Sequence, residues 1–491
     1  MSQSPAAPRP EPQAAPLPEP QAAPLPEPQA APLLEPQAAP RREPEAAPRP
    51  AVGDELTLRV ESLAFGGAGV ARAPGGYVVF VDGGFPGDLV RARVHQRKRS
   101  YAQARVTTLL EPGPDQIAPL ADHPGAPWQV LRYERQLEIK QEQVDDALRR
   151  IGKLDGFKLE PILAAAEQWR YRNKLEYSFG TGEDGTLLCG FHAPGSWEHI
   201  HHIEDCLLAS EISNEARRQV LEFCRAHGLA AFDRRTHEGF LRNLVVREGR
   251  RSGQLMVRLV TSSGELDVDA LAAAVSCHSL LWTHTDARAE TTAGGHTEIL
   301  AGARKIDERI GDLELGISPE AFFQTNTEMA ERLYGLIVEA AALRGWDRVY
   351  DLYSGIGSIA LTLAPRAGTV HGLELIAEAV ADAIENARRN EITNTDFYAG
   401  DVRLALGELV ERAGRPDVLV VDPPRAGLSA KIVRRVIEAA PKRIVYVSCN
   451  PTTLAPNAAQ LVEAGWRLDQ VTPVDMFPQT PHIECVAVFN R

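Results

Sequence analysis

Short apolar runs alternate with amphipathic stretches in the last third of the chain. From Ser318 onward, this pattern predicts strands buried on both faces, each followed by a helix with one apolar face. The expected strands are residues 347–351, 369–374, 395–399, 417–422 and 443–448, with a closing pair at 470–475 and 484–489. The expected helices are residues 320–343, 357–364, 376–390, 402–413, 428–440 and 453–464. The alternation predicts a doubly wound, Rossmann-like α/β sheet over residues 318–491, which binds its ligand at the strand ends.

A different rhythm runs through residues 51–110, where β-favouring runs are separated by glycine turns, as in "ELTLRVESLAFGGAGVARAPGGYVVFVDGGFPGDLVRARV". Four or five short strands in this length are typical of a small barrel of the oligonucleotide-binding type. The following stretch, "RARVHQRKRSYAQAR", carries six basic residues and no acidic residue between Arg91 and Arg105. Nucleic-acid binding is favoured over a merely solvated charged edge.

Residues 111–317 mix helical segments with strands and predict an α+β domain. The amphipathic stretch "WQVLRYERQLEIKQEQVDDALRRIG" predicts a helix. The strand-like runs "YRNKLEYSFG", "FLRNLVVREG" and "GQLMVRLVT" carry cations and amides. We expect this central part to offer a basic face to RNA, although no motif in it fixes a reaction.

The amino-terminal stretch is an eight-residue repeat, with five copies between residues 8 and 47. Its frequent prolines remove backbone donors and favour extended chain, and it has few large apolar residues to bury. We therefore predict a disordered tail over residues 1–50.

Composition narrows the protein class without changing these assignments. No run of eighteen apolar residues and no secretory signal is visible among the 491 residues, so we expect no membrane association. Six scattered cysteines without metal-ligand spacing indicate reduced thiols and a cytoplasmic location. The net charge of −13 is a weak objection to RNA binding, because phosphate contacts depend on local basic patches.

The stretch "RVYDLYSGIGSIALTLA" predicts a strand, a glycine turn and a helix that together form a cofactor site. Gly355 and Gly357 let the backbone approach a ligand, but the third glycine of a dinucleotide fingerprint is missing. Glu374 ends the next strand, where a carboxylate accepts hydrogen bonds from ribose hydroxyls, and Asp401 follows the third strand on the adenine side. An adenosyl pocket without pyrophosphate indicates S-adenosyl-L-methionine as cofactor, rather than a nucleotide-free domain with surface acids.

Three further side chains are expected at the reactive end of this sheet. In "VLVVDPPRAGL", two prolines fix the backbone after Asp422, and Arg425 stands where amino-methylating enzymes commonly carry an aromatic residue. Cys449 follows the apolar run "IVYVS", and Glu484 enters the last apolar strand. A cysteine here is either a core thiol or a nucleophile, and a carboxylate in such a run is either paired or raised in pKa.

Cys449 and Glu484 together suit the methylation of carbon 5 of uracil. This carbon is a poor nucleophile until a thiolate adds to C6 and generates an enolate. After methyl transfer, a base must remove the C5 proton so that the thiol can leave. The arginine in place of an aromatic residue also favours carbon over amine methylation, so we expect Cys449 to be the nucleophile and Glu484 the base.

The chain resembles the RNA uracil-5-methyltransferases that carry an amino-terminal TRAM domain. The resemblance covers about residues 52–491 and rests on "FGGAGVAR", "YRNKLEYS", "FFQTN", "DLYSGIGSIAL", "DPPRAGL", "SCNPTTLAPN" and "FPQTPHIE". It implies cofactor contacts at Gln324, Tyr353, Glu374 and Asp422, with the nucleophile at Cys449 and the base at Glu484. It also implies that a TRAM barrel (51–110) and a central domain (111–317) hold RNA while the target base is flipped into the methyltransferase domain.

The sequence departs from this family at one place. Many relatives bind an iron–sulfur cluster through four cysteines, but Ile117, His123 and Ala126 stand at three of those positions here. Only Cys206 resembles the fourth ligand, and one cysteine is too few for a cluster. We therefore predict that the protein binds no iron–sulfur cluster and no other metal.

Together with the resemblance, these patterns predict a monomeric, S-adenosyl-L-methionine-dependent enzyme that methylates C5 of a specific uridine in RNA. The resemblance implies 23S ribosomal RNA as the expected substrate. One alternative is a tRNA uracil-54 methyltransferase, although the shortest tRNA members of the family generally lack a TRAM domain. Another is an RNA-binding or chaperone-like protein whose methylation site has decayed. The intact Cys449, Glu484, Asp422 and glycine turn disfavour decay.

Overall fold

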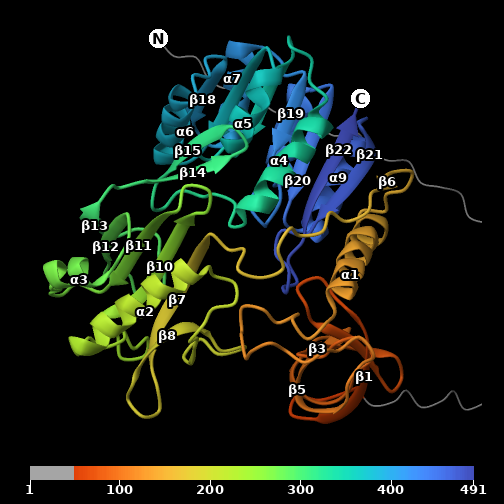
Figure 1. Ribbon diagram of the computed structural model, residues 1–491. Helices are drawn as coiled ribbons and strands as arrows, with labels where there is room; N and C mark the ends of the chain where they lie inside the picture. Colours follow the sequence, from red (N-terminus) through yellow and green to blue (C-terminus); the bar gives the residue numbers. More distant parts are fainter. Residues whose placement is uncertain (1–48) are drawn as a thin grey trace, which may run out of the picture. The chain divides into compact units, whose positions relative to one another are not determined.

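The computed structural model describes residues 49–491, so the predicted tail lies almost wholly outside the described residues. The mixed α/β class expected from the sequence is confirmed (Figure 1). Three sheets and a two-stranded ribbon account for the strands in this part of the chain. No helix within residues 49–491 is long and apolar enough to cross a membrane.

The first sheet is the predicted small barrel, and it is closed in the order β1-β2-β3-β5-β4. Its strands are β1 (Glu55–Leu63), β2 (Gly69–Ala73), β3 (Tyr77–Asp82), β4 (Leu89–Arg97) and β5 (Tyr101–Glu111). Alternate side chains point inward and form a core of small aliphatic residues, including Val60, Val79 and Val90. The basic stretch noted in the sequence lies on β4, β5 and the exposed turn between them.

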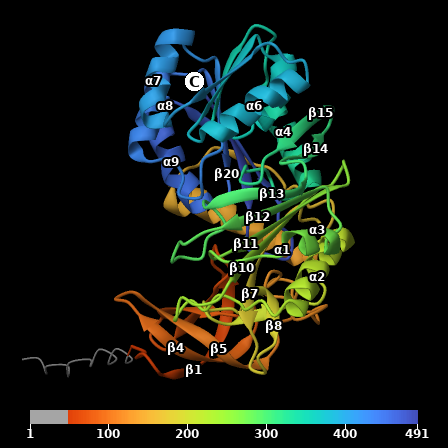
Figure 2. The ribbon, with the colours of Figure 1, turned by 90° about the vertical axis from the view of Figure 1, so that its left-hand side faces the viewer.

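The second sheet has seven strands in the order β13-β12-β11-β10-β7-β8-β9. They are β7 (Lys174–Thr181), β8 (Leu187–His192), β9 (Ile200–His202), β10 (Leu241–Gly249), β11 (Gln254–Thr261), β12 (Ser279–His284) and β13 (His296–Gly302). Figures 1 and 2 show helices α2 (Glu211–Ala226) and α3 (Val268–Ala274) along one side of this sheet. Their apolar faces share a core with the strands. The ribbon of β14 (Ile306–Ile310) and β15 (Leu313–Ile317) follows.

The third sheet has eight strands in the order β18-β17-β16-β19-β20-β22-β21-β6. They are β16 (Arg348–Leu352), β17 (Thr369–Glu374), β18 (Thr395–Ala399), β19 (Val418–Val421), β20 (Arg443–Ser448), β21 (Arg467–Val474), β22 (Glu484–Asn490) and β6 (Lys158–Leu159). The helices are α4 (Thr327–Ala341), α5 (Ser358–Leu363), α6 (Ala377–Arg389), α7 (Val402–Ala413), α8 (Ala430–Ala439) and α9 (Pro451–Glu463). This arrangement is the predicted doubly wound, Rossmann-like sheet.

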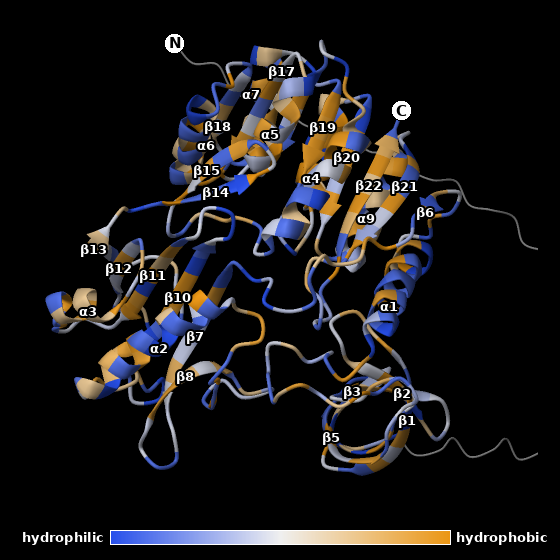
Figure 3. Cartoon of the chain, in the orientation of Figure 1, coloured by the Kyte–Doolittle hydropathy of each residue, from blue (hydrophilic) through white to orange (hydrophobic). Residues whose placement is uncertain are grey.

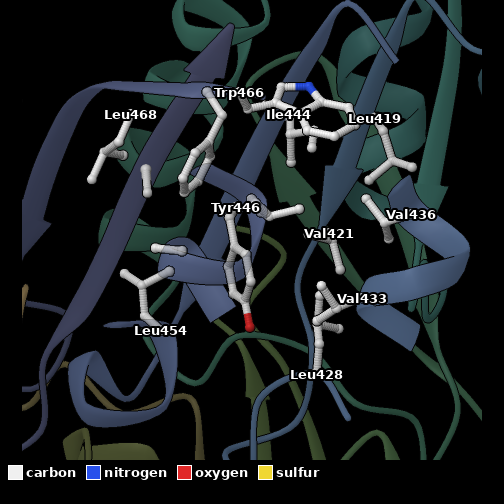
Figure 4. Packing of buried hydrophobic residues seen from close by; sticks show 14 of the residues in the cluster. Leu419, Val421, Leu428, Val433, Val436, Ile444, Tyr446, Leu454, Trp466 and Leu468 are labelled. Atoms are coloured by element: carbon white, nitrogen blue, oxygen red, sulfur yellow. The ribbon is translucent and has the colours of Figure 1, made fainter. Parts of the chain in front are cut away.

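The strands of this third sheet are hydrophobic on both faces because helices cover both sides (Figure 3). On one face, Tyr446 packs among aliphatic side chains, and its hydroxyl donates to Oδ1 of Asn457 at 3.0 Å. Figure 4 shows this cluster, with Leu419 and Val421 from β19, Ile444 and Tyr446 from β20, and Val433 and Val436 from α8. The second core cluster lies on the opposite face.

Two details of the third sheet differ from the sequence prediction. Helix α4 begins at Thr327 rather than at residue 320, because the Asn326 side chain accepts a hydrogen bond from the Met329 amide at 3.2 Å and caps the helix. The preceding segment, including Gln324, is therefore not helical. The edge strand β6 was not predicted, and it pairs in parallel with β21.

Helix α1 (Tyr133–Asp146) contacts the loop between β21 and β22 through a buried ion pair. Lys140 Nζ lies 2.6 Å from Asp475 Oδ1, and both side chains are fully buried. Lys140 also donates to the carbonyl of Phe477 at 3.1 Å. These bonds fix the loop that leads into β22, where the predicted base Glu484 is the first residue.

Candidate active site

The predicted site residues lie at one edge of the third sheet. Strands β16 to β20 run parallel, so the loops after them leave from the same edge. Strand β22 is antiparallel to β20, so its first residue also lies there. In chain order, this edge carries the glycine turn, Glu374, Asp401, Asp422, Cys449 and Glu484. Connections leave β16 in opposite directions, which is where open α/β sheets bind their ligands.

The Glu374 carboxylate accepts hydrogen bonds from two backbone amides, one of which belongs to the glycine turn. The Gly355 amide donates to Glu374 Oε2 at 3.1 Å, and the Ile376 amide donates to Oε1 at 2.9 Å. Tyr353 has a positive φ of 66°, and its amide donates to the Leu373 carbonyl at 2.8 Å. A Cβ built on Gly355 would face open space, which leaves this stretch of backbone accessible to a ligand.

The two predicted glycines differ in their surroundings. A Cβ at Gly357 would lie 2.9 Å from the Phe397 ring, so this glycine is needed for packing between the turn and β18. Gly357 also precedes the first turn of α5 with a φ of 83°. A contact between Gly357 and a cofactor therefore stays a prediction.

Asp401 lies at the start of α7, and its carboxylate already has partners. It accepts hydrogen bonds from the Arg403 amide at 2.8 Å and from Arg403 Nε at 3.0 Å. These hydrogen bonds lower the Asp401 pKa. Burial, and then the charges of Asp401 and Glu374, raise the pKa of Tyr353 to about 12. The carboxylates of Asp401 and Glu374 thus lie close enough to Tyr353 to affect its pKa. An adenine that bound to Asp401 would share the carboxylate of this residue with Arg403.

Gln324 and Asp422 meet beside the reactive end of the site. Gln324 Nε2 lies 3.5 Å from Asp422 Oδ2, and the Gln324 carbonyl accepts a hydrogen bond from Asn173 Nδ2 at 2.9 Å. The segment before α4 is thereby fixed to the start of β7. Burial raises the pKa of Asp422 to about 7, so this carboxyl is only partly ionised at neutral pH.

Cys449 and Glu484 lie on neighbouring strands, β20 and β22. Residue Ser448, just before Cys449, is directly paired with Cys485, just after Glu484. Burial raises the pKa of the Cys449 thiol to about 11, with smaller effects from the Glu484 and Asp422 carboxyls. Burial also raises the pKa of Glu484 well above its usual value, and the Asp422 charge raises it further. The Cys449 thiol is therefore protonated at neutral pH in the ligand-free protein, and the surroundings of Glu484 favour its protonated form.

Arg425 is the cation that opposes these shifts. Its charge lowers the pKa of both Cys449 and Glu484. Its carbonyl accepts hydrogen bonds from Asn450 Nδ2 at 3.2 Å and from Thr453 Oγ1 at 3.3 Å, which fix the proline turn to the loop after Cys449. Its Nη2 lies 3.4 Å from His482 Nδ1. The departure from the aromatic pattern therefore places a positive charge beside the thiol.

Sequence reasoning missed one acid of this cluster, Asp351. It is fully buried on β16, and neither carboxylate oxygen has a hydrogen-bond partner within residues 49–491. Burial, followed by the charges of Asp422 and Glu374, raises its pKa well above the usual value. An acid inside an otherwise apolar strand, as in "RVYDL", is the sequence signal that points to it.

The residues at the expected cluster positions are also placed by the structure. His123 and Ala126 are buried and Ile117 is exposed. His123 Nε2 lies 3.3 Å from Cys206 Sγ, and burial lowers the His123 pKa to about 4. Within residues 49–491, no group of three or more His, Cys, Asp or Glu side chains is arranged to hold a metal. The expected lack of a cluster stays a prediction.

Comparison with known proteins agrees with this fold. Residues 311–491 match the tRNA (Uracil-5-)-methyltransferase family, and residues 50–107 match the TRAM domain. An uncharacterized RNA methyltransferase of Halalkalibacterium halodurans is 37% identical over 89% of this chain and 97% of its own length. One of Chlorobaculum tepidum is 37% identical over 83% of this chain and 90% of its own.

A solved structure is similar across most of the chain. Pyrococcus abyssi tRNA (uracil-54, C5)-methyltransferase, in complex with S-adenosyl-L-homocysteine, superposes with a TM-score of 0.72 at 28% identity. The match covers 88% of this chain and 100% of that one. Fold, TRAM barrel and relatives together define an RNA methyltransferase. More narrowly, the chain belongs to the RNA uracil-5-methyltransferase family.

Proposed function

We propose that this protein transfers a methyl group from S-adenosyl-L-methionine to C5 of a uridine in RNA. The observation that carries the proposal is the meeting of Cys449, Glu484 and Asp422 at one strand edge. The glycine turn and Glu374 stand at the same edge. A nucleophile, a carboxyl base and a cofactor pocket are the parts that methylation of C5 needs.

The residues present fit the proposed cofactor. Glu374 is fixed by two amides at the end of β17, where it suits ribose hydroxyls, and the backbone at Gly355 faces open space. Asp422 has only a long contact to Gln324 and suits a sulfonium cation. When bound, the cofactor supplies the electrophilic methyl group. The structural relative of Pyrococcus abyssi was solved with S-adenosyl-L-homocysteine, which supports this assignment.

In the proposed reaction, the thiolate of Cys449 adds to C6 of the uracil, and the Sγ–C6 bond makes C5 nucleophilic. Once C5 carries the methyl group, Glu484 takes the C5 proton and the Sγ–C6 bond breaks, which regenerates the thiolate. The Cys449 thiol is protonated in the ligand-free protein, so it must pass its proton to solvent before it adds to C6, and the Glu484 carboxyl must be ionised when it takes the C5 proton. Arg425 favours both ionised forms and is proposed to promote this step.

We further propose that the chain is organised as a barrel over residues 51–110 and a central part over residues 111–317, which bind RNA, and a methyltransferase domain over residues 318–491. The exposed basic turn between β4 and β5 supports RNA binding by the barrel. The TRAM match over residues 50–107 supports the first boundary.

We propose 23S ribosomal RNA as the substrate, on the argument that the shortest tRNA members of the family lack the barrel present here. Methylation of uracil 54 in tRNA is the second candidate. It is favoured by the likeness to the Pyrococcus abyssi tRNA enzyme over that protein's full length.

Mass mapping of 5-methyluridine in ribosomal RNA and tRNA from a deletion strain tests both candidates. One modified uridine should disappear, return with the wild-type gene, and stay absent with Cys449→Ala. The RNA that carries this uridine decides between the two candidates. If every 5-methyluridine persists in the deletion strain, the proposed function is wrong.

A further inference from the structure

A cavity of about 410 Å³ lies next to the segment that carries Gln324. Its walls come from the start of β7, the end of β10 and residues 320–325. Three of the lining side chains are basic (Arg172, Lys174 and Arg247) and two are acidic (Glu176 and Glu320). We call this cavity the arginine pocket. Phe322, which is 67% exposed, also lines it.

Two guanidinium groups of this pocket lack an acidic partner. Arg247 is 2% exposed and donates one hydrogen bond, from Nη2 to the Ala321 carbonyl at 2.7 Å, while its Nε and Nη1 have no partner. Neither Arg247 nor Arg172 forms an ion pair within residues 49–491. A buried charge without a counter-charge is costly, so a fold that retains one has a use for it.

Each of the two lining acids already pairs with a cation, one of which is Lys174 itself. Lys174 Nζ lies 2.6 Å from Glu176 Oε1, and Arg258 Nη1 lies 3.2 Å from Glu320 Oε1. Moreover, Arg247 and Lys174 are directly paired across strands β10 and β7. Glu176 balances the charge of Lys174, but no acidic side chain within residues 49–491 forms an ion pair with Arg247. The pocket therefore has a net positive charge that the described part of the chain does not balance.

The arginine pocket adjoins the candidate active site. The Asn173 amide donates to the Thr325 carbonyl at 2.9 Å, and Asn173 Nδ2 donates to the Gln324 carbonyl at 2.9 Å. The charge of Arg172 contributes to the lowered pKa of His482, two residues before Glu484. Burial lowers the pKa of Arg247 only to about 10, so it remains a cation at neutral pH.

We propose that the arginine pocket binds a backbone phosphate of the RNA beside the nucleotide that enters the active site, with Phe322 stacking on a neighbouring base. The inference rests on the proposed function, since RNA is the anionic polymer that such an enzyme must hold. Guanidinium groups match phosphate oxygens in geometry and charge. Exposed aromatic side chains beside cations are the usual means of holding unpaired nucleotides.

The test measures RNA binding against salt for Arg247→Met and Arg172→Gln. Arg366→Met is the matched control, because Arg366 is exposed and follows α5, away from the carboxyl ends of the strands. The probe is a transcribed, unmodified 23S ribosomal RNA fragment, and tRNA transcripts are measured in parallel. Losing one phosphate contact should reduce the slope of log K against log salt by about 0.7 to 0.9. Phe322→Ala should weaken binding at every salt concentration while leaving this slope unchanged.

Melting temperature and cofactor binding distinguish this role from a structural one. Arg247→Met removes an unbalanced buried charge at similar volume, so its melting temperature should not fall below that of the control. A fall in melting temperature together with an unchanged salt slope would overturn the proposal. A second pair of results would also overturn it: 10 mM inorganic phosphate raises the melting temperature of wild type, while the salt slope of RNA binding is the same in the variants as in wild type. These results would indicate a site for small anions. RNA binding is measured without methyl transfer, so failure to methylate uridine refutes the proposed function and leaves this test standing.

Discussion

Replacing Asp422 by asparagine should stabilise the ligand-free protein at high pH. The Asp422 carboxyl is buried, and burial raises its pKa from 3.8 to about 7. The folded protein thus holds a proton that the unfolded chain releases, and stability is lost as the pH rises from about 4 through about 7. Asparagine has nearly the same shape and no ionisation, so the variant is spared this loss.

The structure gives the size of the effect. A pKa difference of about 3 corresponds to about 4 kcal/mol at pH 8, where the full difference is expressed. For a domain of the size of residues 318–491, this increase in the free energy of unfolding raises the melting temperature by on the order of 10 °C.

Scanning calorimetry of wild type and Asp422→Asn at pH 5, 6, 7 and 8 measures this effect. The melting temperatures should differ least at pH 5, where about 40% of the effect is already present, and should diverge progressively up to pH 8. Asp312→Asn, an exposed aspartate in the turn between β14 and β15, is the control and should show no such divergence. A difference in melting temperature that is constant with pH, or a variant that melts below wild type at pH 8, would show that the raised pKa of Asp422 does not destabilise the folded protein.

Three further outcomes are expected. The affinity for S-adenosyl-L-methionine should rise relative to that for S-adenosyl-L-homocysteine between pH 6 and 8, as Asp422 ionises beside the sulfonium; calorimetry should show this rise in wild type and its loss in Asp422→Asn. The rate of Cys449 alkylation, followed by peptide mass spectrometry, should increase about tenfold per pH unit between pH 7 and 9, because the Cys449 pKa is about 11. The rate should be lower in Arg425→Gln, and a rate independent of pH would contradict the raised pKa. Replacing Arg97, Lys98 and Arg99 by glutamine should weaken RNA binding and flatten its salt dependence, whereas an unchanged slope would mean that this exposed turn is only solvated.

The third sheet was predictable because its central strands are buried on both faces and its helices on one. Strands 369–374, 395–399 and 443–448 have the bounds expected from their apolar runs. The start of β21 was missed by three residues, because Arg467 and Asp469 lie at the polar end of the strand. Strand β6 is two residues long, and nothing in its local sequence indicates its pairing with β21.

The positions of the candidate residues were predictable where a residue follows a strand, and they were not predictable where they depend on strand register. Cys449, Asp422 and Glu484 could be placed because each marks the end or start of an apolar run. The opposition of Arg247 and Lys174 could not be predicted, since it depends on the pairing of two strands distant in sequence. The raised pKa values likewise depend on burial among side chains from several strands, which a local pattern does not specify.

The roles of Cys449 and Glu484 are tested most directly by trapping the covalent complex. Cys449→Ala removes the group that adds to C6, so this variant should neither methylate RNA nor form an adduct. Glu484→Gln leaves addition and methyl transfer possible but removes the base for the C5 proton, so the Sγ–C6 bond should persist. Both variants should keep their affinity for S-adenosyl-L-methionine, which serves as the folding control.

The measurement is denaturing gel electrophoresis of each variant after incubation with substrate RNA and S-adenosyl-L-methionine. A slowly migrating protein–RNA band is expected with Glu484→Gln and should be absent with Cys449→Ala. Methylation by Cys449→Ala, or normal turnover by Glu484→Gln, would contradict the proposed roles of Cys449 and Glu484.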